Sequence, residues 1–91
     1  MLKDPDRFPH VGVRDALQGL RRRLSTTGRY QFGSSGEGEL TIKGAEQTAY
    51  ARKYKIRDGW RVARCRGKDC LEVVHPKSAK EVFAFITGRI H

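Results

Sequence analysis

The sequence predicts an α+β fold, in which an N-terminal helix precedes an antiparallel sheet of four to five strands and a C-terminal helix packs on that sheet. Apolar residues recur at helical spacing near both ends of the chain, whereas the middle alternates polar and apolar residues with the period of a strand. Short turns that contain glycine separate the alternating runs. Because 91 residues suit one small domain, we expect a single domain over residues 12–91 after an extended arm at residues 1–11.

The expected arm and the first helix differ in composition. Pro5 and Pro9 stand among charged residues, a pattern typical of an extended segment. The first helix is predicted over Gly12–Ser25, and the turn-forming residues that follow Ser25 end it. Its apolar side chains fall on one face, which we expect to be buried: Val13, Leu17, Leu20 and Leu24.

The next two alternating runs predict a β-hairpin. Its strands are expected at Arg29–Gly33 and Glu39–Lys43, and the serines and glycines of residues 34–38 suit a flexible loop between them. Successive side chains of a strand point to opposite faces. Each strand therefore offers one apolar face, formed by Tyr30 and Phe32 in the first and by Leu40 and Ile42 in the second.

The segment Ala45–Ile56 fits either a helix or a strand. Its alanines favour a helix, whereas the alternation of its tyrosines with lysines favours a strand, and we expect a strand in the second half after a helical turn near Glu46–Ala49. A three-residue turn at residues 57–59, with glycine at its last position, then sets the register. Two pairs are predicted to face each other on the core side: Ile56 with Trp60, and Tyr54 with Val62.

A second hairpin is predicted over Trp60–Arg66 and Asp69–His75, around a Gly67-Lys68 turn. Glycine at the first turn position suits a type II′ turn. This turn predicts three cross-strand pairs: Arg66 with Asp69, Cys65 with Cys70, and Val62 with Val73. The side chains expected on the core face are then Trp60, Val62, Leu71 and Val73.

The chain closes with a predicted helix. Pro76 ends the preceding strand, and Ser78 followed by Glu81 fits a capping box, with the serine as N-cap. The helix carries an apolar stripe that we expect to pack on the sheet, made of Ala79, Val82, Phe83, Ile86 and Ile90, with Phe85 at its margin.

The chain is strongly basic, with a net charge of +9 and a pI near 10.2. Residues 52–68 hold eight basic side chains and one acidic side chain, so most of the excess charge lies in this stretch. A positive excess of this size on so small a surface favours a polyanionic partner. We therefore predict a non-enzymatic protein that binds nucleic acid, with duplex DNA favoured over RNA.

The predicted contacts form a basic cluster, which consists of Arg52, Lys53, Lys55, Arg57, Arg61, Arg64, Arg66 and Lys68. The predicted register places Lys53, Lys55 and Arg61 together on the sheet face opposite the core. Such a face suits the phosphates of a nucleic-acid backbone. Among the aromatic residues, Tyr50 is the one least needed by the core and the best candidate for stacking on an exposed base.

Two other readings of the same charge stay open. A basic face can instead dock on an acidic protein surface, which would make the chain an interaction module or inhibitor. Lysine and arginine on edge strands also protect small sheets from aggregation, without any partner. The run at residues 21–23 is a weaker candidate for a secondary contact on the first helix.

The outline from Gly59 to Arg89 resembles the three-stranded sheet plus helix of phage-integrase arm-binding and AP2-type DNA-binding domains. This resemblance implies a sheet laid in the major groove. A competing outline resembles excisionase-like proteins, with Gln47–Ile56 and Trp60–Gly67 as a helix-turn-helix. The helix–sheet–helix order is also similar to double-stranded-RNA-binding domains, whose Gly-Pro-x-His loop is absent here. No motif diagnostic of these families is present. An accessory or regulatory protein of a phage or mobile element is the hypothesis that fits this size.

The sequence offers little for catalysis, metals or membranes. We expect no cofactor and no metal, because Cys65, Cys70 and His75 lack the paired spacing of a zinc site. Two cysteines do not make a disulfide framework, and we expect them to be reduced. Neither a signal peptide nor an apolar run of membrane-spanning length is found, so a cytoplasmic location is expected.

Overall fold

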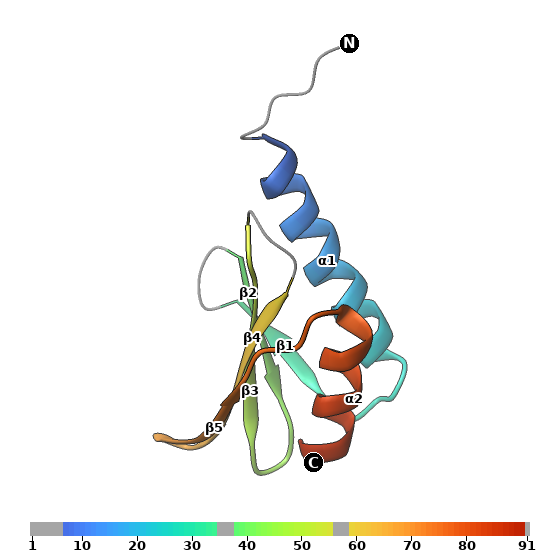
Figure 1. The fold of residues 1–91 in the computed structure, drawn as a ribbon. Coiled ribbons are helices and arrows are strands. Elements are labelled where there is room, and N and C mark those ends of the chain that lie inside the picture. The colour runs from blue at the N-terminus through green and yellow to red at the C-terminus, as the bar shows by residue number, and fades with distance from the viewer. Residues whose placement is uncertain (1–6, 35–37, 56–58, 91) are drawn as a thin grey trace.

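The structure, a computed structural model, describes residues 7–34, 38–55 and 59–90, and the side chains from residue 12 onward. Within these residues it contains two helices and a five-stranded antiparallel sheet (Figure 1). The predicted α+β class is confirmed. The elements are α1 (Arg7–Ser25), β1 (Gln31–Gly33), β2 (Glu39–Lys43), β3 (Thr48–Lys53), β4 (Trp60–Arg66), β5 (Asp69–Val74) and α2 (Ala79–Arg89).

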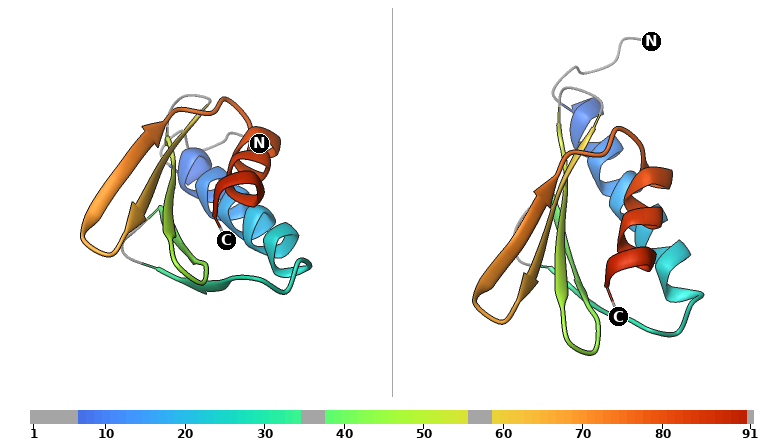
Figure 2. Two further views of the ribbon diagram at one scale, coloured as in Figure 1. Left: turned by 90° about the horizontal axis from the view of Figure 1, so that it is seen from below. Right: turned by 60° about the horizontal axis from the view of Figure 1, so that its bottom comes forward.

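The strands follow one another across the sheet in chain order, from β1 at one edge to β5 at the other. Both helices lie on the same side of this sheet (Figure 2). The core lies between the sheet and the two helices, with Trp60, Ile42, Leu20 and Ile86 among its largest side chains. The other side of the sheet carries no helix, and we call it the open face.

Helix α1 begins at Arg7, five residues before its predicted start. The predicted arm is therefore wrong for residues 7–11, which are helical, whereas residues 1–6 lie outside the described part. Pro9 occupies the first turn, where a proline is tolerated because the N–H groups of that turn have no partner within the helix. The predicted apolar face is confirmed, with Val13, Leu20 and Leu24 buried.

Strand β2 has the predicted bounds, and Leu40 and Ile42 point into the core as expected. The third strand differs from its prediction. Residues 48 and 49 belong to β3, so the helical turn expected near Glu46–Ala49 is wrong, and the helix-turn-helix alternative is excluded because β3 and β4 are strands.

The register of β3 against β4 is shifted by three residues from the predicted one. Trp60 lies opposite Lys53, and Val62 lies opposite Ala51, so Tyr54 is not paired with Val62. The small side chains of Ala49 and Ala51 are fully buried and let large residues of the helices approach the sheet. The predicted register would bring Tyr54 into this space. Residues 57 and 58 of the predicted turn lie outside the described residues, and so does Ile56, the predicted partner of Trp60.

The β4–β5 hairpin confirms its predicted turn and the two pairs next to it, Arg66 with Asp69 and Cys65 with Cys70. Gly67 has a φ of 59°, as the first position of a type II′ turn requires. A β-bulge then shifts the ladder, so that Val62 pairs with Val74 instead of Val73. The expectation that Leu71 and Val73 belong to the core is therefore wrong, since they are 45% and 42% exposed.

Helix α2 confirms the predicted cap and stripe. The Ser78 Oγ accepts a hydrogen bond from the Glu81 N–H at 3.2 Å. The Glu81 carboxylate in turn accepts from the Lys77 N–H at 2.9 Å, so two backbone donors at the helix start are satisfied. Val82, Ile86 and Ile90 of the stripe are fully buried against the sheet.

Candidate nucleic-acid interface

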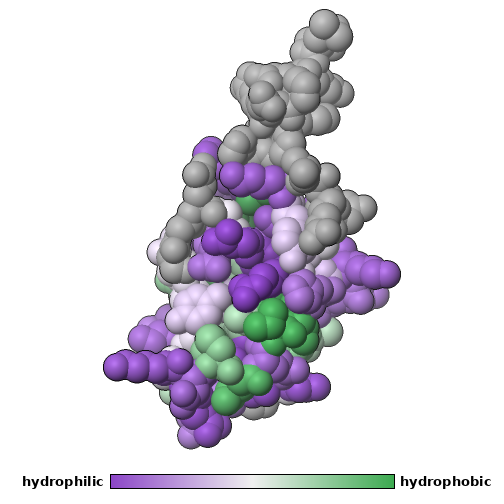
Figure 3. All heavy atoms as spheres, turned by 60° about the vertical axis from the view of Figure 1, so that its left-hand side comes forward, coloured by the Kyte–Doolittle hydropathy of each residue, from purple (hydrophilic) through white to green (hydrophobic). Residues whose placement is uncertain are grey.

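The open face combines cationic and apolar side chains. The strand register places on it Glu39, Thr41 and Lys43 of β2, Tyr50 and Arg52 of β3, Arg61, Ala63 and Cys65 of β4, and Cys70 and Val73 of β5. Figure 3 shows this side of the molecule, where apolar residues gather in one place among hydrophilic ones. A face of this kind offers both charge and contact area to a partner.

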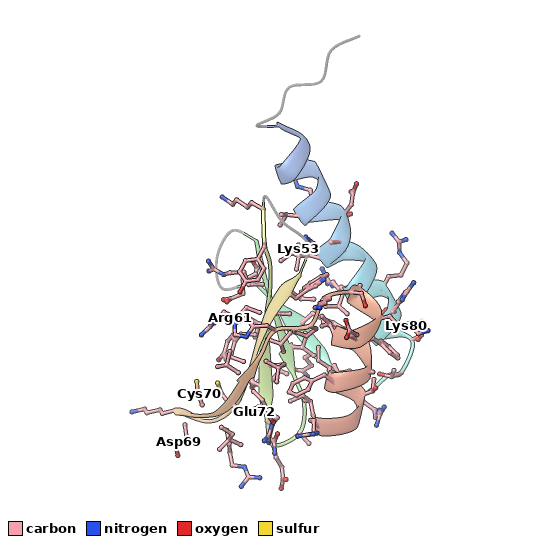
Figure 4. The ribbon with its side chains drawn as sticks, viewed as in Figure 1. Lys53, Arg61, Asp69, Cys70, Glu72 and Lys80 are labelled. Carbon is pink, nitrogen blue, oxygen red and sulfur yellow. The ribbon has the colours of Figure 1, made fainter. Side chains whose placement is uncertain are left out.

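Arg52 and Arg61 lie directly opposite each other on β3 and β4, and we call them the arginine pair. Both residues are exposed, and the Arg61 side chain lies on the side away from the helices (Figure 4). Like charges at directly opposed positions of an antiparallel pair repel each other. The only carboxylate recorded near Arg52 among the described residues is that of Glu39, at 3.8 Å, and its side chain is only 14% exposed. The pair therefore presents two positive charges to solvent, and the Glu39 carboxylate offsets part of the charge of Arg52.

A shallow hollow of about 210 Å³ lies at the end of β3, next to the arginine pair. Its lining consists of Gly38, Arg52, Lys53, Tyr54 and Lys55. The Lys53 Nζ donates a hydrogen bond to the Tyr54 carbonyl oxygen at 3.0 Å, which holds this ammonium beside the hollow. Three cationic residues thus line one concave spot, which suits an anion the size of a phosphate group.

The structure brings together half of the predicted basic cluster. Arg52, Lys53 and Lys55 surround the hollow, and Arg61 adjoins them through Arg52. The prediction that Lys53 shares a sheet face with Arg61 is wrong, because the three-residue register shift puts Lys53 opposite Trp60. Lys55 lies just beyond β3, and so it does not stand on that sheet face either.

The other predicted contacts lie elsewhere. Arg66 and Lys68 are exposed at the β4–β5 turn, beside Asp69. Arg57 lies outside the described residues. Lys43 was not part of the predicted cluster, because it stands on a strand of no net charge, and only its place in the sheet brings it to the open face.

Arg64 is engaged within the protein and is only 19% exposed along its side chain. Its Nε and Nη2 donate to the Glu72 Oε1 at 2.9 and 2.8 Å, and its Nη1 donates to the Gln47 Oε1 at 3.1 Å. Arg89 of α2 reaches the same Glu72 oxygen at 3.2 Å. This network joins the sheet to α2 and engages the Arg64 guanidinium within the protein.

Both cysteines are free and lie opposite each other on the open face. Cys65 is buried, whereas Cys70 is exposed (Figure 4). Burial, the hydrogen bond with Cys70 and the charge of Cys70 together raise the pKa of the Cys65 thiol to about 11. Cys65 is therefore a neutral thiol at physiological pH, and a weak nucleophile.

This difference predicts stepwise alkylation of the native protein. At pH 8, iodoacetamide is expected to modify Cys70 promptly and Cys65 at least tenfold more slowly, because Cys65 is buried and holds its proton. Mass spectrometry of the peptides at successive times measures both rates, and the protein in urea is the control in which the two should converge. Equal rates in the native state would contradict the assignment of Cys65 to a buried position.

The described residues give no further chemical site. Within residues 7–34, 38–55 and 59–90, no group of three or more His, Cys, Asp and Glu side chains is placed to hold a metal ion. Neither helix of this described part is long and apolar enough to cross a membrane. The chain matches no protein-family model, and no curated protein or solved structure is significantly similar to it. The candidate interface therefore depends on its own geometry and charge.

Proposed function

We propose that this protein binds nucleic acid, and that the arginine pair and the hollow at the end of β3 contact the phosphate backbone. The observation that supports the proposal best is the placement of Arg52 directly opposite Arg61 on the open face. Two opposed guanidinium groups repel each other, and an anion bound between them removes that repulsion. Arginine presents several donors in a planar fork, which matches phosphate oxygens well.

The surrounding charge supports the same partner. Lys53 and Lys55 line the hollow that Arg52 also lines, and Lys43 adds a cation two strands from Arg61. The net charge of +9 attracts a polyanion from a distance. The sequence favours duplex DNA over RNA, and that preference remains a prediction. The same positive electrostatic potential would also attract an acidic protein, and the experiment below distinguishes the two kinds of partner.

The test is fluorescence anisotropy of a labelled oligonucleotide, titrated with the full chain over salt concentrations from about 50 to 200 mM. We expect binding that weakens steeply with salt, because each neutralised phosphate contributes a slope of roughly −0.7 to −0.9 in the logarithm of the association constant against log salt. Replacing both Arg52 and Arg61 by glutamine is expected to weaken binding about tenfold or more at the lowest salt and to make the slope shallower by about one to two.

The control variant removes a positive charge far from the open face. Lys80 is exposed on α2, on the opposite side of the molecule from the open face (Figure 4). Lys80→Gln removes one charge, whereas the double arginine variant removes two, and it is expected to change the affinity by less than about twofold at moderate salt. Failure of the unaltered chain to bind any oligonucleotide at the lowest salt would overturn the proposal and leave an acidic protein as the partner to seek.

A further inference from the structure

The open face carries an apolar patch beside the arginine pair. The patch consists of Tyr50, Ala63, Leu71 and Val73, and the strand register places Tyr50, Ala63 and Val73 in one row across β3, β4 and β5. Leu71 and Val73 are the large hydrophobic residues found exposed in the described part of the chain. Exposed apolar side chains that gather in one place, within a polar surround, typically mark a binding surface (Figure 3).

The patch and the arginine pair are neighbouring rows of the same sheet. Arg52 follows Tyr50 by two residues on β3, and Arg61 precedes Ala63 by two residues on β4. Side chains two residues apart on a strand point to the same face and stand about 7 Å from each other. The two arginines, with Glu39 beside Arg52 in the same row on β2, therefore lie one step away from the parallel row that contains Tyr50, Ala63 and Val73.

A nucleotide has the same two-part chemistry, since a charged phosphate is joined through a sugar to a flat base. With its phosphate at the arginine pair, a strand that turns its bases toward the sheet would place a base over Tyr50 and Ala63. Ala63 is only 6% exposed, so a base at this place would rest on Tyr50 and on the exposed side chains of Leu71 and Val73. Aromatic side chains next to cations are the usual platform for unpaired bases.

A duplex would make less use of this surface. Its bases are paired and stacked within the helix, so a protein meets only their edges in the grooves and the phosphates outside. Leu71 and Val73 would then lie against the charged backbone, where apolar side chains gain nothing. The charge of the neighbouring arginines also makes an apolar peptide a poor occupant of the face.

We infer that the nucleic acid bound at the open face is single-stranded, and that Tyr50 stacks on an unpaired base held against Ala63, Leu71 and Val73. This inference rests on the proposed function. This inference replaces the preference for duplex DNA that the sequence indicated. The sequence analysis placed Leu71 and Val73 in the core, whereas the structure exposes both side chains on the open face.

The test compares three labelled probes at one salt concentration of about 150 mM: a twelve-nucleotide oligo(dT), a blunt duplex of twelve base pairs, and a twelve-unit abasic phosphodiester strand. We expect oligo(dT) to bind at least tenfold more tightly than the abasic strand, which has the same backbone charge without bases. We also expect oligo(dT) to bind more tightly than the duplex.

Two variants at one position isolate the stacking. Tyr50→Leu keeps an apolar side chain but removes the aromatic ring, and it should weaken binding of oligo(dT) about fivefold or more and leave binding of the abasic strand unchanged. Tyr50→Phe keeps the ring and should bind within about twofold of the unaltered chain. Far-UV circular dichroism confirms that both variants are folded before their affinities are compared.

The outcomes distinguish this inference from the proposed function. Equal affinity for all three probes, with no effect of Tyr50→Leu, would overturn the single-strand inference and leave backbone binding intact. No binding of any probe, even at the lowest salt, would overturn both. Tighter binding of the duplex than of oligo(dT) would also overturn the inference and would restore the preference expected from the sequence.

Discussion

Replacing Trp60 by alanine is expected to lower the free energy of unfolding by about 3 to 5 kcal/mol. Trp60 is 2% exposed and belongs to the core between the sheet and both helices. Its removal leaves a cavity that the rigid strands β3 and β4 cannot close. Small domains are stabilised by only about 5 to 15 kcal/mol, so this loss removes a large share of the free energy of unfolding.

Urea unfolding followed by far-UV circular dichroism measures this loss, because Trp60 is the only tryptophan and its fluorescence disappears with the substitution. Leu71→Ala is the control, since it also truncates a large apolar side chain of the sheet, but one that is 45% exposed. The control should lose less than about 1 kcal/mol. Equal losses in the two variants would contradict the placement of Trp60 in the core and Leu71 outside it.

Replacing Glu72 by alanine is expected to lower the free energy of unfolding by about 1 to 3 kcal/mol. The Glu72 Oε1 accepts hydrogen bonds from Arg64 and Arg89, and its loss leaves the poorly exposed Arg64 guanidinium without a counter-charge. Urea unfolding gives the difference. Glu46→Ala, a truncation of an exposed glutamate, is the control and should stay within about 0.5 kcal/mol of the unaltered chain.

A double variant tests the role given to Arg64. Arg64→Leu combined with Glu72→Leu removes one charge of each sign, so the net charge does not change. Because both partners leave together, no poorly exposed charge is left without a counter-charge, and only Arg89, 56% exposed along its side chain, loses its contact with Glu72. The double variant should therefore be more stable than Glu72→Ala. Its affinity for oligonucleotides should equal that of the unaltered chain, and a large loss of affinity would return Arg64 to the interface.

The sequence contained the local features of the fold in readable form. The alternation of Leu40 and Ile42 gave the exact bounds of β2, the glycine at residue 67 gave the turn, and Ser78 with Glu81 gave the start of α2. Each of these signals acts within a few residues, through the pleat of a strand, a backbone angle or a cap.

The errors concern interactions between elements. The register of β3 depends on the buried alanines Ala49 and Ala51. Their small side chains matter because the helices pack directly against them, which only the assembled fold shows. The bulge next to Cys65 reverses the faces of Leu71 and Val73, and no local residue pattern announced it. Both errors bear on the candidate site, where the first moved Lys53 off the cationic face and the second supplied the apolar patch.

The cluster of arginines could be predicted from the sequence, but which arginines face solvent and which are held within the protein could not. Arg61 and Arg64 are three residues apart on one strand, yet one faces solvent and the other is held by Glu72 and Gln47. The partners of Arg64 come from β5 and from the segment before β3, so only the assembled sheet distinguishes the two arginines.

The sequential order of the strands has a consequence for how the chain reaches this structure. Every strand pair joins neighbours in the chain, so the sheet can grow hairpin by hairpin, and each step closes only a short loop. The contact of α1 with α2 instead joins distant parts of the chain, as does the hydrogen bond from the Tyr30 hydroxyl to the Ile90 carbonyl oxygen, 60 residues away. Loop closure of this length is favourable only after the sheet has drawn the two ends together. We therefore expect docking of the helices to be a late step of folding, and until it occurs Ile42 and Trp60 would remain open to water and to other unfolded chains.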